Sequence, residues 1–415
     1  MAKIYPFRPY RYSPSAGALA NLVTQPYDKI SPEMQKRYLS LSPHNLVRVI
    51  LGERFATDSD AENVYTRSAK FFNDWISSAV LTQEKEPAFF GYFQEFTVPD
   101  TGEKLTRKGF IGLGAVEDYS AKVVHRHEQT LSGPKKDRRR VLEHTRAHFG
   151  QIFMLYPDPA GRIDAILDRF ATGSPAAEVI DEYETAHRLY KIDDAVAIRQ
   201  MQELMADKKL VIADGHHRYE TAMAFRDDNP KLEDARNVMM TFVNMHSAGL
   251  RILATHRVVS GLPEVNQDAF LQKASEQFIV KRLDSTAALR QVWEQMEPEQ
   301  IRIGVVFAGS PDVFLLQSER KGRLDVQVLH DDLLGRALGI SAEAVREEKF
   351  LQYVRGVEAA ADAVRNGSAQ AAFLLEATTV QQVADTSFSG GVMPQKSTDF
   401  YPKLLTGLAI YRLEK

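Results

Sequence analysis

The segment at residues 210–225, LVIADGHHRYETAMAF, constrains the fold more than any other part of the chain. Its first four residues form an apolar run that is typical of a buried strand, and an Asp-Gly pair at 214–215 then interrupts the run. From Tyr219 onward, apolar side chains return at three- and four-residue spacing, which predicts a helix that begins near His216. The sequence therefore predicts a strand, a tight turn and a helix in direct succession.

Predicted strands and helices also alternate in the rest of the chain. Residues 88–98 and 105–116 are rich in aromatic and β-branched residues and flank a Pro-Asp-Thr-Gly turn, which predicts an antiparallel hairpin. Helical periodicity continues at 193–209, and we expect a further helix over 266–299. Hairpins among alternating strands and helices indicate an α+β or mixed α/β fold.

The length of 415 residues corresponds to about two or three domains. We expect an N-terminal α/β region at 1–110, a core at 111–260 and a C-terminal α/β region at 261–415.

Composition excludes several classes of protein. The chain has no cysteine, which removes disulfide scaffolds, thiolate metal sites and cysteine nucleophiles. Its net charge of -3 lacks the basic excess of a dedicated nucleic-acid binder. The N-terminal residues lack the apolar stretch of a signal peptide, and the apolar runs are shorter than the roughly 20 residues that span a bilayer. We therefore expect a cytoplasmic protein with neither nucleic-acid nor membrane partners.

The turn at 214–218 carries residues that suit an anion. The free N–H groups and the positive dipole end of a helix start attract phosphates, and Gly215 allows a phosphate to approach the backbone closely. His216, His217 and Arg218 add donors at the same edge, and His216 is also a candidate acid–base group. The alternative is that Asp214 caps the helix while the histidines only fill the turn. The segment matches neither a Walker A loop nor a dinucleotide-binding fingerprint.

The second candidate segment is 125–140, HRHEQTLSGPKKDRRR. Glu128, which is flanked by histidines, is a candidate general base, and the alternative is a solvated acid in a surface loop. Lys135 and Arg138 belong to a run of basic residues that could reach phosphates. Such a run is more often a solvated helix face.

The third candidate segment is the loop at 393–403, MPQKSTDFYPK. Lys396, Ser397 and Thr398 offer an ammonium group and two hydroxyls for a phosphate or a carboxylate, and Lys403 offers a second cation. A plain turn before the terminal strand is the alternative. The N-terminal PYDKIS has the same ambiguity, because its Tyr27 and Asp28 could line a site or its polar residues could cap the following helix.

A metal is expected only as a companion of phosphates. Magnesium is held by one or two carboxylates together with phosphate oxygens, and Asp214 is the first choice for that role. The histidines at 125, 127, 216 and 217 lack the spacing of a catalytic zinc motif.

The motif ADGHHRYETA resembles the hallmark of domain-of-unknown-function family 1015. The resemblance extends to QPYDKIS at 25–31, HEQTLSGPKKDR at 127–138 and MPQKSTDFYPKLLTGL at 393–408. A shorter form of the motif is similar to one found in the ParB and sulfiredoxin-like nucleotide-binding fold and in free serine kinases. The resemblance implies a ParB/sulfiredoxin-like core with additional segments at both ends. By the likeness to the kinases it also implies a glutamate that activates the serine hydroxyl, and Glu128 matches that position.

These observations lead to one preferred hypothesis and one rival. The preferred function is a phosphotransferase that uses ATP or ADP with Mg²⁺ to phosphorylate free L-serine or a similar amino or hydroxy acid, with Glu128, Asp214 and His216 as catalytic residues. The rival is a regulatory protein that binds ATP or CTP without turnover. A metal-dependent hydrolase is a third and weaker hypothesis. The sequence predicts neither the nucleotide preference nor the oligomeric state.

Overall fold

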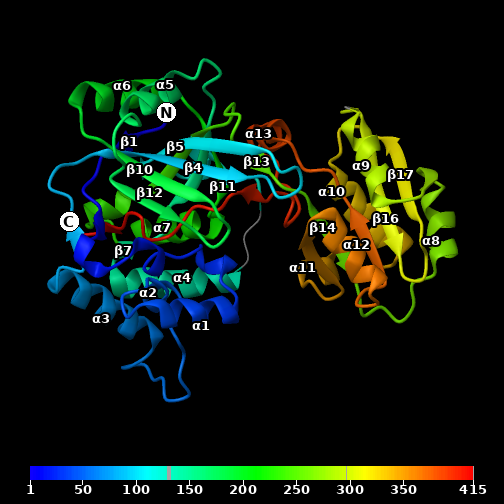
Figure 1. The fold of residues 1–415 in the computed structure, drawn as a ribbon, viewed down its shortest axis with the longest axis horizontal. Helices are drawn as coiled ribbons and strands as arrows, with labels where there is room; N and C mark the ends of the chain where they lie inside the picture. Colours follow the sequence, from blue (N-terminus) through cyan, green and yellow to red (C-terminus); the bar gives the residue numbers. More distant parts are fainter. Residues whose placement is uncertain (129–131, 296, 415) are drawn as a thin grey trace. The chain divides into compact units, whose positions relative to one another are not determined.

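The computed structural model describes residues 1–128, 132–295 and 297–414. The chain forms two compact units (Figure 1). The first unit comprises Met1–Arg251 and Pro402–Lys415, and the second comprises Ile252–Tyr401. The second unit is thus an insertion in the sequence of the first. Both units combine helices with sheets, which confirms the predicted mixed α/β class. The division at 110 and 260 stays a prediction.

In the described part of the first unit, nine strands form one mixed sheet in the order β6-β11-β8-β12-β5-β4-β10-β9, with β1 paired to β5. These strands are β1 (Ile4–Tyr5), β4 (Phe89–Thr97), β5 (Lys104–Ala115), β6 (Val124–His125), β8 (Ile152–Tyr156), β9 (Ala177–Ile180), β10 (Ala186–Ile192), β11 (Leu210–Asp214) and β12 (Asn237–Asn244). Strands β4 and β5 are antiparallel neighbours, which confirms the predicted hairpin. Strand β11 pairs parallel to β6 and antiparallel to β8, so the sheet mixes both directions.

Helices cover both faces of this sheet. Figure 1 shows α5 and α6 on one side and α7 with α4 on the other. The helices of the first unit are α1 (Pro32–Leu41), α2 (Val47–Ile50), α3 (Val64–Ser77), α4 (Ser132–Thr145), α5 (Arg162–Phe170), α6 (Ala195–Met205) and α7 (His216–Asp228). Polar side chains cap several of them, as Asn63 does for α3 and Asp194 for α6.

Two small sheets complete the first unit. Strand β2 (Tyr10–Tyr12) pairs with β3 (Leu81–Gln83), and β7 (Ala147–His148) pairs with β21 (Tyr411–Arg412). An isolated bridge joins Thr24 to Thr406. The pairing of β21 with β7 and the bridge from Thr24 to Thr406 hold the C-terminal segment within the first unit.

The second unit has its own six-stranded sheet, in the order β15-β17-β16-β19-β14-β18, and the strand pairs within it for which a register is defined are antiparallel. Its strands are β14 (Thr255–Val259), β15 (Ile279–Leu283), β16 (Gln300–Phe307), β17 (Val313–Glu319), β18 (Leu351–Arg355) and β19 (Ala371–Leu374). Its helices are α8 (Gln267–Ala274), α9 (Thr286–Glu294), α10 (Asp325–Val328), the π-helix at Leu329–Ala337, α11 (Ala342–Arg346), α12 (Val357–Arg365) and α13 (Val380–Phe388). The predicted helix over 266–299 is wrong, because β15 separates α8 from α9.

Two further short strands, β13 (Arg251–Ile252) and β20 (Phe400–Tyr401), pair with each other. Within the described ranges, no helix combines the length and apolar character needed to cross a bilayer.

Candidate functional site

The predicted strand, turn and helix are present as β11, Gly215 and α7. Gly215 has a φ of 98°, a conformation that a residue with a side chain adopts only under strain. A Cβ at this position would also lie 3.1–3.2 Å from atoms of the Arg218 guanidinium group. No side chain caps α7, so the Asp214 cap considered as the alternative is absent from this described turn. The first amides of α7 are therefore not used by a capping side chain.

Three cations act on the single carboxylate of Asp214 at the end of β11. Arg218 Nη2 lies 3.7 Å and Lys403 Nζ 3.9 Å from Asp214 Oδ2. Burial acts to raise the pKa of Asp214, but the charges of Lys403, Arg218 and Lys29 outweigh burial and hold this pKa well below its usual value. The carboxylate is ionised at neutral pH, and three cations act on it. Such a place favours an anionic ligand.

The two histidines at the start of α7 differ in their surroundings. His216 is buried, and its ring stands edge-on to the ring of His127 at a centroid distance of 4.7 Å. Burial lowers the pKa of His127 to about 4 and that of His216 far below its usual value. Both rings are therefore neutral at pH 7. Burial and the nearby Lys135 also lower the pKa of the half-buried His217.

The contact between His127 and His216 places the second candidate segment, residues 125–140, next to the turn at 214–218. The backbone N–H of His127 donates to Nε2 of His216 at 3.5 Å, and the half-buried Glu128 follows directly in the chain. Residues 129–131 of the predicted segment lie outside the described residues. The role of Glu128 as a general base stays a prediction.

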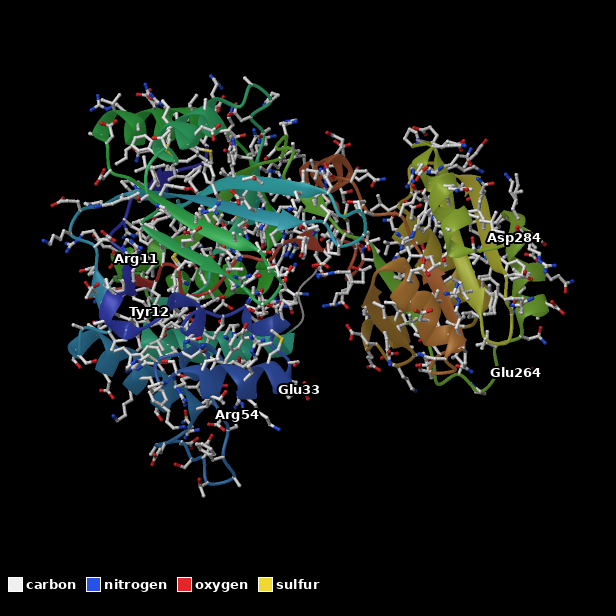
Figure 2. The ribbon with its side chains drawn as sticks, in the orientation of Figure 1. Arg11, Tyr12, Glu33, Arg54, Glu264 and Asp284 are labelled. Atoms are coloured by element: carbon white, nitrogen blue, oxygen red, sulfur yellow. The ribbon has the colours of Figure 1, made fainter. Side chains whose placement is uncertain are left out.

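Most of the basic run on α4 is engaged within the protein. Lys135 forms an ion pair with Glu220 of α7. Arg138 donates to the Ile50 carbonyl at 2.8 Å and lies 4.0 Å above the Tyr27 ring. It also pairs with Asp137, whose other oxygen accepts from Arg54 at 2.7 Å (Arg54 is labelled in Figure 2). Phosphate contacts by Lys135 and Arg138 stay predictions.

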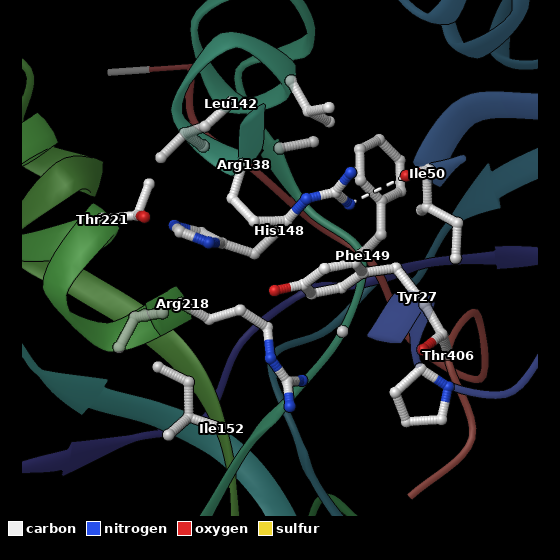
Figure 3. Close-up of a pocket in the computed structure, with 15 residues that line it drawn as sticks. Tyr27, Ile50, Arg138, Leu142, His148, Phe149, Ile152, Arg218, Thr221 and Thr406 are labelled. Atoms are coloured by element: carbon white, nitrogen blue, oxygen red, sulfur yellow. Dashed lines mark hydrogen bonds between the residues drawn. The ribbon is translucent and has the colours of Figure 1, made fainter. Parts of the chain in front are cut away.

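A pocket opens between α4 and α7, next to this turn (Figure 3). Its empty volume is about 620 Å³, which includes space open to solvent. Buried apolar side chains form much of its wall, and polar groups from several elements join them. The lining residues are Pro26, Tyr27, Ile50, Arg138, Val141, Leu142, Ala147, His148, Phe149, Gly150, Ile152, Arg218, Thr221, Val238 and Thr406. Arg218 thus borders both the pocket and the Asp214 carboxylate.

The third candidate segment is divided between the two units. Lys403 belongs to the first unit and lies beside Asp214. Lys396, Ser397 and Thr398 belong to the second unit. There Lys396 is exposed, its carbonyl accepts from buried Arg257 at 3.0 Å, and the Ser397 carbonyl accepts from Thr378 at 2.8 Å. Substrate binding by these three residues and by Lys403 stays a prediction.

The residues around the turn suit magnesium only in company with phosphates. Among the residues that the structure describes, no group of three or more His, Asp or Glu side chains is arranged to hold a metal ion. Asp214 supplies one ionised carboxylate, which suffices for a magnesium ion that takes its other ligands from phosphates and water. The hydrolase hypothesis, which needs a protein cage of ligands, gains no support from this donor set.

Sequence reasoning missed Lys29 as a neighbour of Asp214, and it missed a buried polar cluster beneath Lys403. Arg107 is 1% exposed and donates to Gln94 Oε1 at 3.0 Å, and Gln94 donates to the Lys403 carbonyl at 2.9 Å. The Tyr92 hydroxyl accepts from the backbone N–H of Leu405 at 3.2 Å. The sequence signal for this cluster was the presence of two polar residues, Gln94 and Arg107, in a hairpin that is otherwise rich in aromatic residues.

The cluster continues from Tyr92 through a histidine to a carboxylate. The Tyr92 hydroxyl lies 2.7 Å from His187 Nδ1, and His187 Nε2 lies 3.1 Å from Asp181 Oδ2. Burial lowers the pKa of Arg107 to about 9. We call Tyr92, Gln94, Arg107, Asp181 and His187 the tail clamp, because they hold the backbone of residues 402–405.

The fold and the site together define a mixed α/β protein with an electropositive strand–turn–helix site. The chain belongs to the family described as protein of unknown function (DUF1015), whose model matches residues 4–333. This confirms the family resemblance of the motifs. No curated protein matches the sequence.

Several solved structures are similar to the chain at low identity. A free serine kinase in complex with AMP has 13% identity and a TM-score of 0.35, with 69% of this chain and 89% of that chain covered. A conserved hypothetical protein from Pyrococcus furiosus has 12% identity and a TM-score of 0.35, and the match covers 69% of this chain and 92% of that chain. SbnI from Staphylococcus aureus, with a C-terminal truncation, has 11% identity and a TM-score of 0.36, and the match covers 72% of this chain and 87% of that chain.

Proposed function

We propose that this protein is a nucleotide-dependent phosphotransferase that phosphorylates the hydroxyl group of a small metabolite. The observation that supports this best is the group of three cations at the start of α7, where Arg218, Lys403 and Lys29 act on the carboxylate of Asp214. Phosphoryl transfer depends mainly on positioning and on neutralisation of charge, and such a set of groups provides both.

Each group near the turn has a role in this proposal. The phosphates of ATP or ADP would lie on the amides at Gly215, His216 and His217, with the Arg218 guanidinium as a further donor. Asp214 would hold Mg²⁺ together with phosphate oxygens, and the ion, when bound, supplies charge neutralisation on the transferred group. His216 is buried and neutral, so it would position the turn and not carry charge.

The transfer step is a single displacement. The acceptor hydroxyl oxygen bonds to the terminal phosphorus, the bond from that phosphorus to its bridging oxygen breaks, and the shortened nucleotide leaves. Glu128 would accept the hydroxyl proton as the oxygen attacks. Its place in the chain directly after His127, which contacts His216, supports this assignment.

The proposed acceptor is free L-serine or a similar amino or hydroxy acid, which would place the protein in serine metabolism. The support is the likeness of the ADGHHR motif to that of free serine kinases. The Lys403 ammonium group could neutralise the acceptor carboxylate. Lys396, Ser397 and Thr398 are further proposed contacts of the acceptor.

The second candidate function is a regulatory protein that binds a nucleotide without turnover. The same cations and amides would hold the phosphates, and Glu128 would then have no catalytic role. The observation that favours it is the same group of cations around Asp214, which would hold phosphates whether or not a phosphoryl group is transferred.

Phosphorus NMR distinguishes the two functions. The protein is incubated with Mg²⁺, with ATP or ADP, and with a panel of amino and hydroxy acids. We expect a phosphoserine signal, or the phosphate ester of a similar acid, that is lost in Glu128→Gln and kept in the control Glu62→Gln, which replaces an exposed carboxylate. Nucleotide binding without any acceptor-dependent product would favour the regulatory function. Loss of nucleotide affinity in Glu128→Gln would make the base assignment wrong.

A further inference from the structure

The pocket between α4 and α7 has a mainly apolar wall, with Arg138 and Arg218 among its lining residues. Its wall includes Leu142 and Ile152, which are 4% and 0% exposed, together with the aromatic ring of Phe149. Apolar walls of this kind favour an uncharged ring system over a free ion.

A few polar groups face this apolar wall. Figure 3 shows the Tyr27 hydroxyl and the His148 ring directed into the pocket. The His148 ring stacks on Tyr411 at an interplanar angle of 11°, so its plane is fixed. Burial lowers the pKa of His148 to about 4, and the ring is therefore neutral and offers one donor and one acceptor. Among the described residues, neither the His148 ring nitrogens nor the Tyr27 hydroxyl have a hydrogen-bond partner.

Arg218 connects this pocket with the electropositive turn. Its guanidinium group lies between two glycines, because a Cβ on Gly150 or on Gly215 would come within 3.1 Å of it. The Gln151 carbonyl accepts from Arg218 and holds the group in place. A ligand with an uncharged ring at one end and phosphates at the other would meet Arg218 at its middle.

We infer that this pocket holds the nucleoside part, base and ribose, of the nucleotide whose phosphates lie at the start of α7. The inference rests on the proposed function for the location of the phosphates. It adds the binding site of the base, with His148 and Tyr27 as its hydrogen-bonding groups and Leu142 as part of its apolar wall.

Calorimetric titration with AMP and with inorganic pyrophosphate separates the two halves of this site. In Leu142→Trp the larger side chain fills the pocket, and we expect AMP affinity to fall about 10-fold or more while pyrophosphate affinity stays within about twofold. His148→Phe keeps the stacking on Tyr411 and loses the ring nitrogens, so we expect AMP binding to weaken about 3- to 10-fold. Lys136→Trp, at an exposed position of α4, is the control for a tryptophan on the same helix.

The outcomes separate this inference from the proposed function. His148→Phe covers the case in which Leu142→Trp fails to fold, and thermal unfolding checks both variants. If His148→Phe and Leu142→Trp both fold and both keep the wild-type affinity for AMP, the inference is overturned. Equal losses of AMP affinity and pyrophosphate affinity would also overturn it. So would a loss of L-serine affinity with AMP affinity unchanged. Failure of the proposed function appears elsewhere, as the absence of a phosphorylated product in the NMR experiment.

Discussion

At the scale of single residues, the turn at 214–218 is explained by conformation and charge. Gly215 is required by its positive φ and by the guanidinium group next to it. Arg218 is fixed by the Gln151 carbonyl and by its 3.7 Å approach to Asp214, so its fork is oriented before any ligand binds. A pre-oriented guanidinium binds phosphate with less loss of entropy than a mobile lysine.

The first prediction concerns this arginine. Arg218→Ala removes a forked donor and one of the cations near Asp214, and we expect AMP and pyrophosphate affinities both to fall by about 10-fold or more. Arg218→Lys should recover only part of the loss, because an ammonium group lacks the fork. Calorimetric titration measures both variants, with Arg140→Ala of the basic run as the charge-matched control. Unchanged affinity in Arg218→Ala would place the phosphates elsewhere.

The second prediction is a pH dependence of stability that comes from His148. Burial holds the pKa of His148 at about 4, below the value of about 6.5 in the unfolded chain. The unfolded state therefore binds a proton first as the pH falls. The contribution of His148 to stability is complete above about pH 6.5 and is lost as the pH falls toward 4, by at most about 1.4 kcal/mol per pH unit.

Comparison of the wild type with His148→Phe isolates this contribution. We expect the free energy of unfolding of the wild type to fall more steeply than that of the variant between pH 6.5 and 4, in urea titrations at several pH values. Parallel curves for the two proteins would show that His148 does not titrate as its burial implies.

At the scale of elements, the site depends on a tail segment that local sequence does not specify. Lys403 reaches Asp214 because the tail clamp binds the backbone on both sides of it, at the carbonyls of 402 and 403 and at the N–H of Leu405. The clamp residues come from β4, β5, β10 and the turn before β10. Buried polar networks of this kind fix a single arrangement when their members are satisfied.

The third prediction tests the clamp. Tyr92→Phe removes the hydroxyl that accepts from Leu405 and contacts His187, leaving both groups buried without that partner. We expect a loss of about 1–3 kcal/mol in stability. We also expect a raised KM for the acceptor in the transfer assay, because Lys403 loses its fixed position. Tyr5→Phe, at a more exposed tyrosine of β1, is the control. A stability loss without any change in KM would make the clamp purely structural.

The helices and strands also show which parts of the fold could be predicted from the sequence and which could not. The succession of β11 and α7 was predictable because its signals are local: an apolar run, a glycine and helical spacing. The helix expected over 266–299 failed because β15 is an edge strand with mostly exposed side chains, and it exists through its pairing with β17. The tail clamp likewise joins residues separated by about 300 positions, as in the bond from Gln94 to Lys403, and no single segment encodes it.

At the scale of the whole molecule, the chain has two units with separate hydrophobic cores. Met154 of β8 lies in a core of the first unit and Ile303 of β16 in a core of the second, and both are 0% exposed. The residues of the Asp214 turn and of the pocket belong to the first unit alone. Since a domain with its own core usually unfolds cooperatively, we expect two thermal transitions.

The fourth prediction assigns these transitions by scanning calorimetry. Met154→Ala and Ile303→Ala each leave a cavity that costs about 2–5 kcal/mol, which corresponds to a shift of about 4–20 °C in the transition of the affected unit. AMP should raise only the transition that Met154→Ala lowers, because a ligand stabilises the unit that binds it. Ile303→Ala should lower the other transition and leave AMP affinity unchanged. If both substitutions and AMP move one common transition, the two units unfold together, and the site depends on the stability of the whole chain.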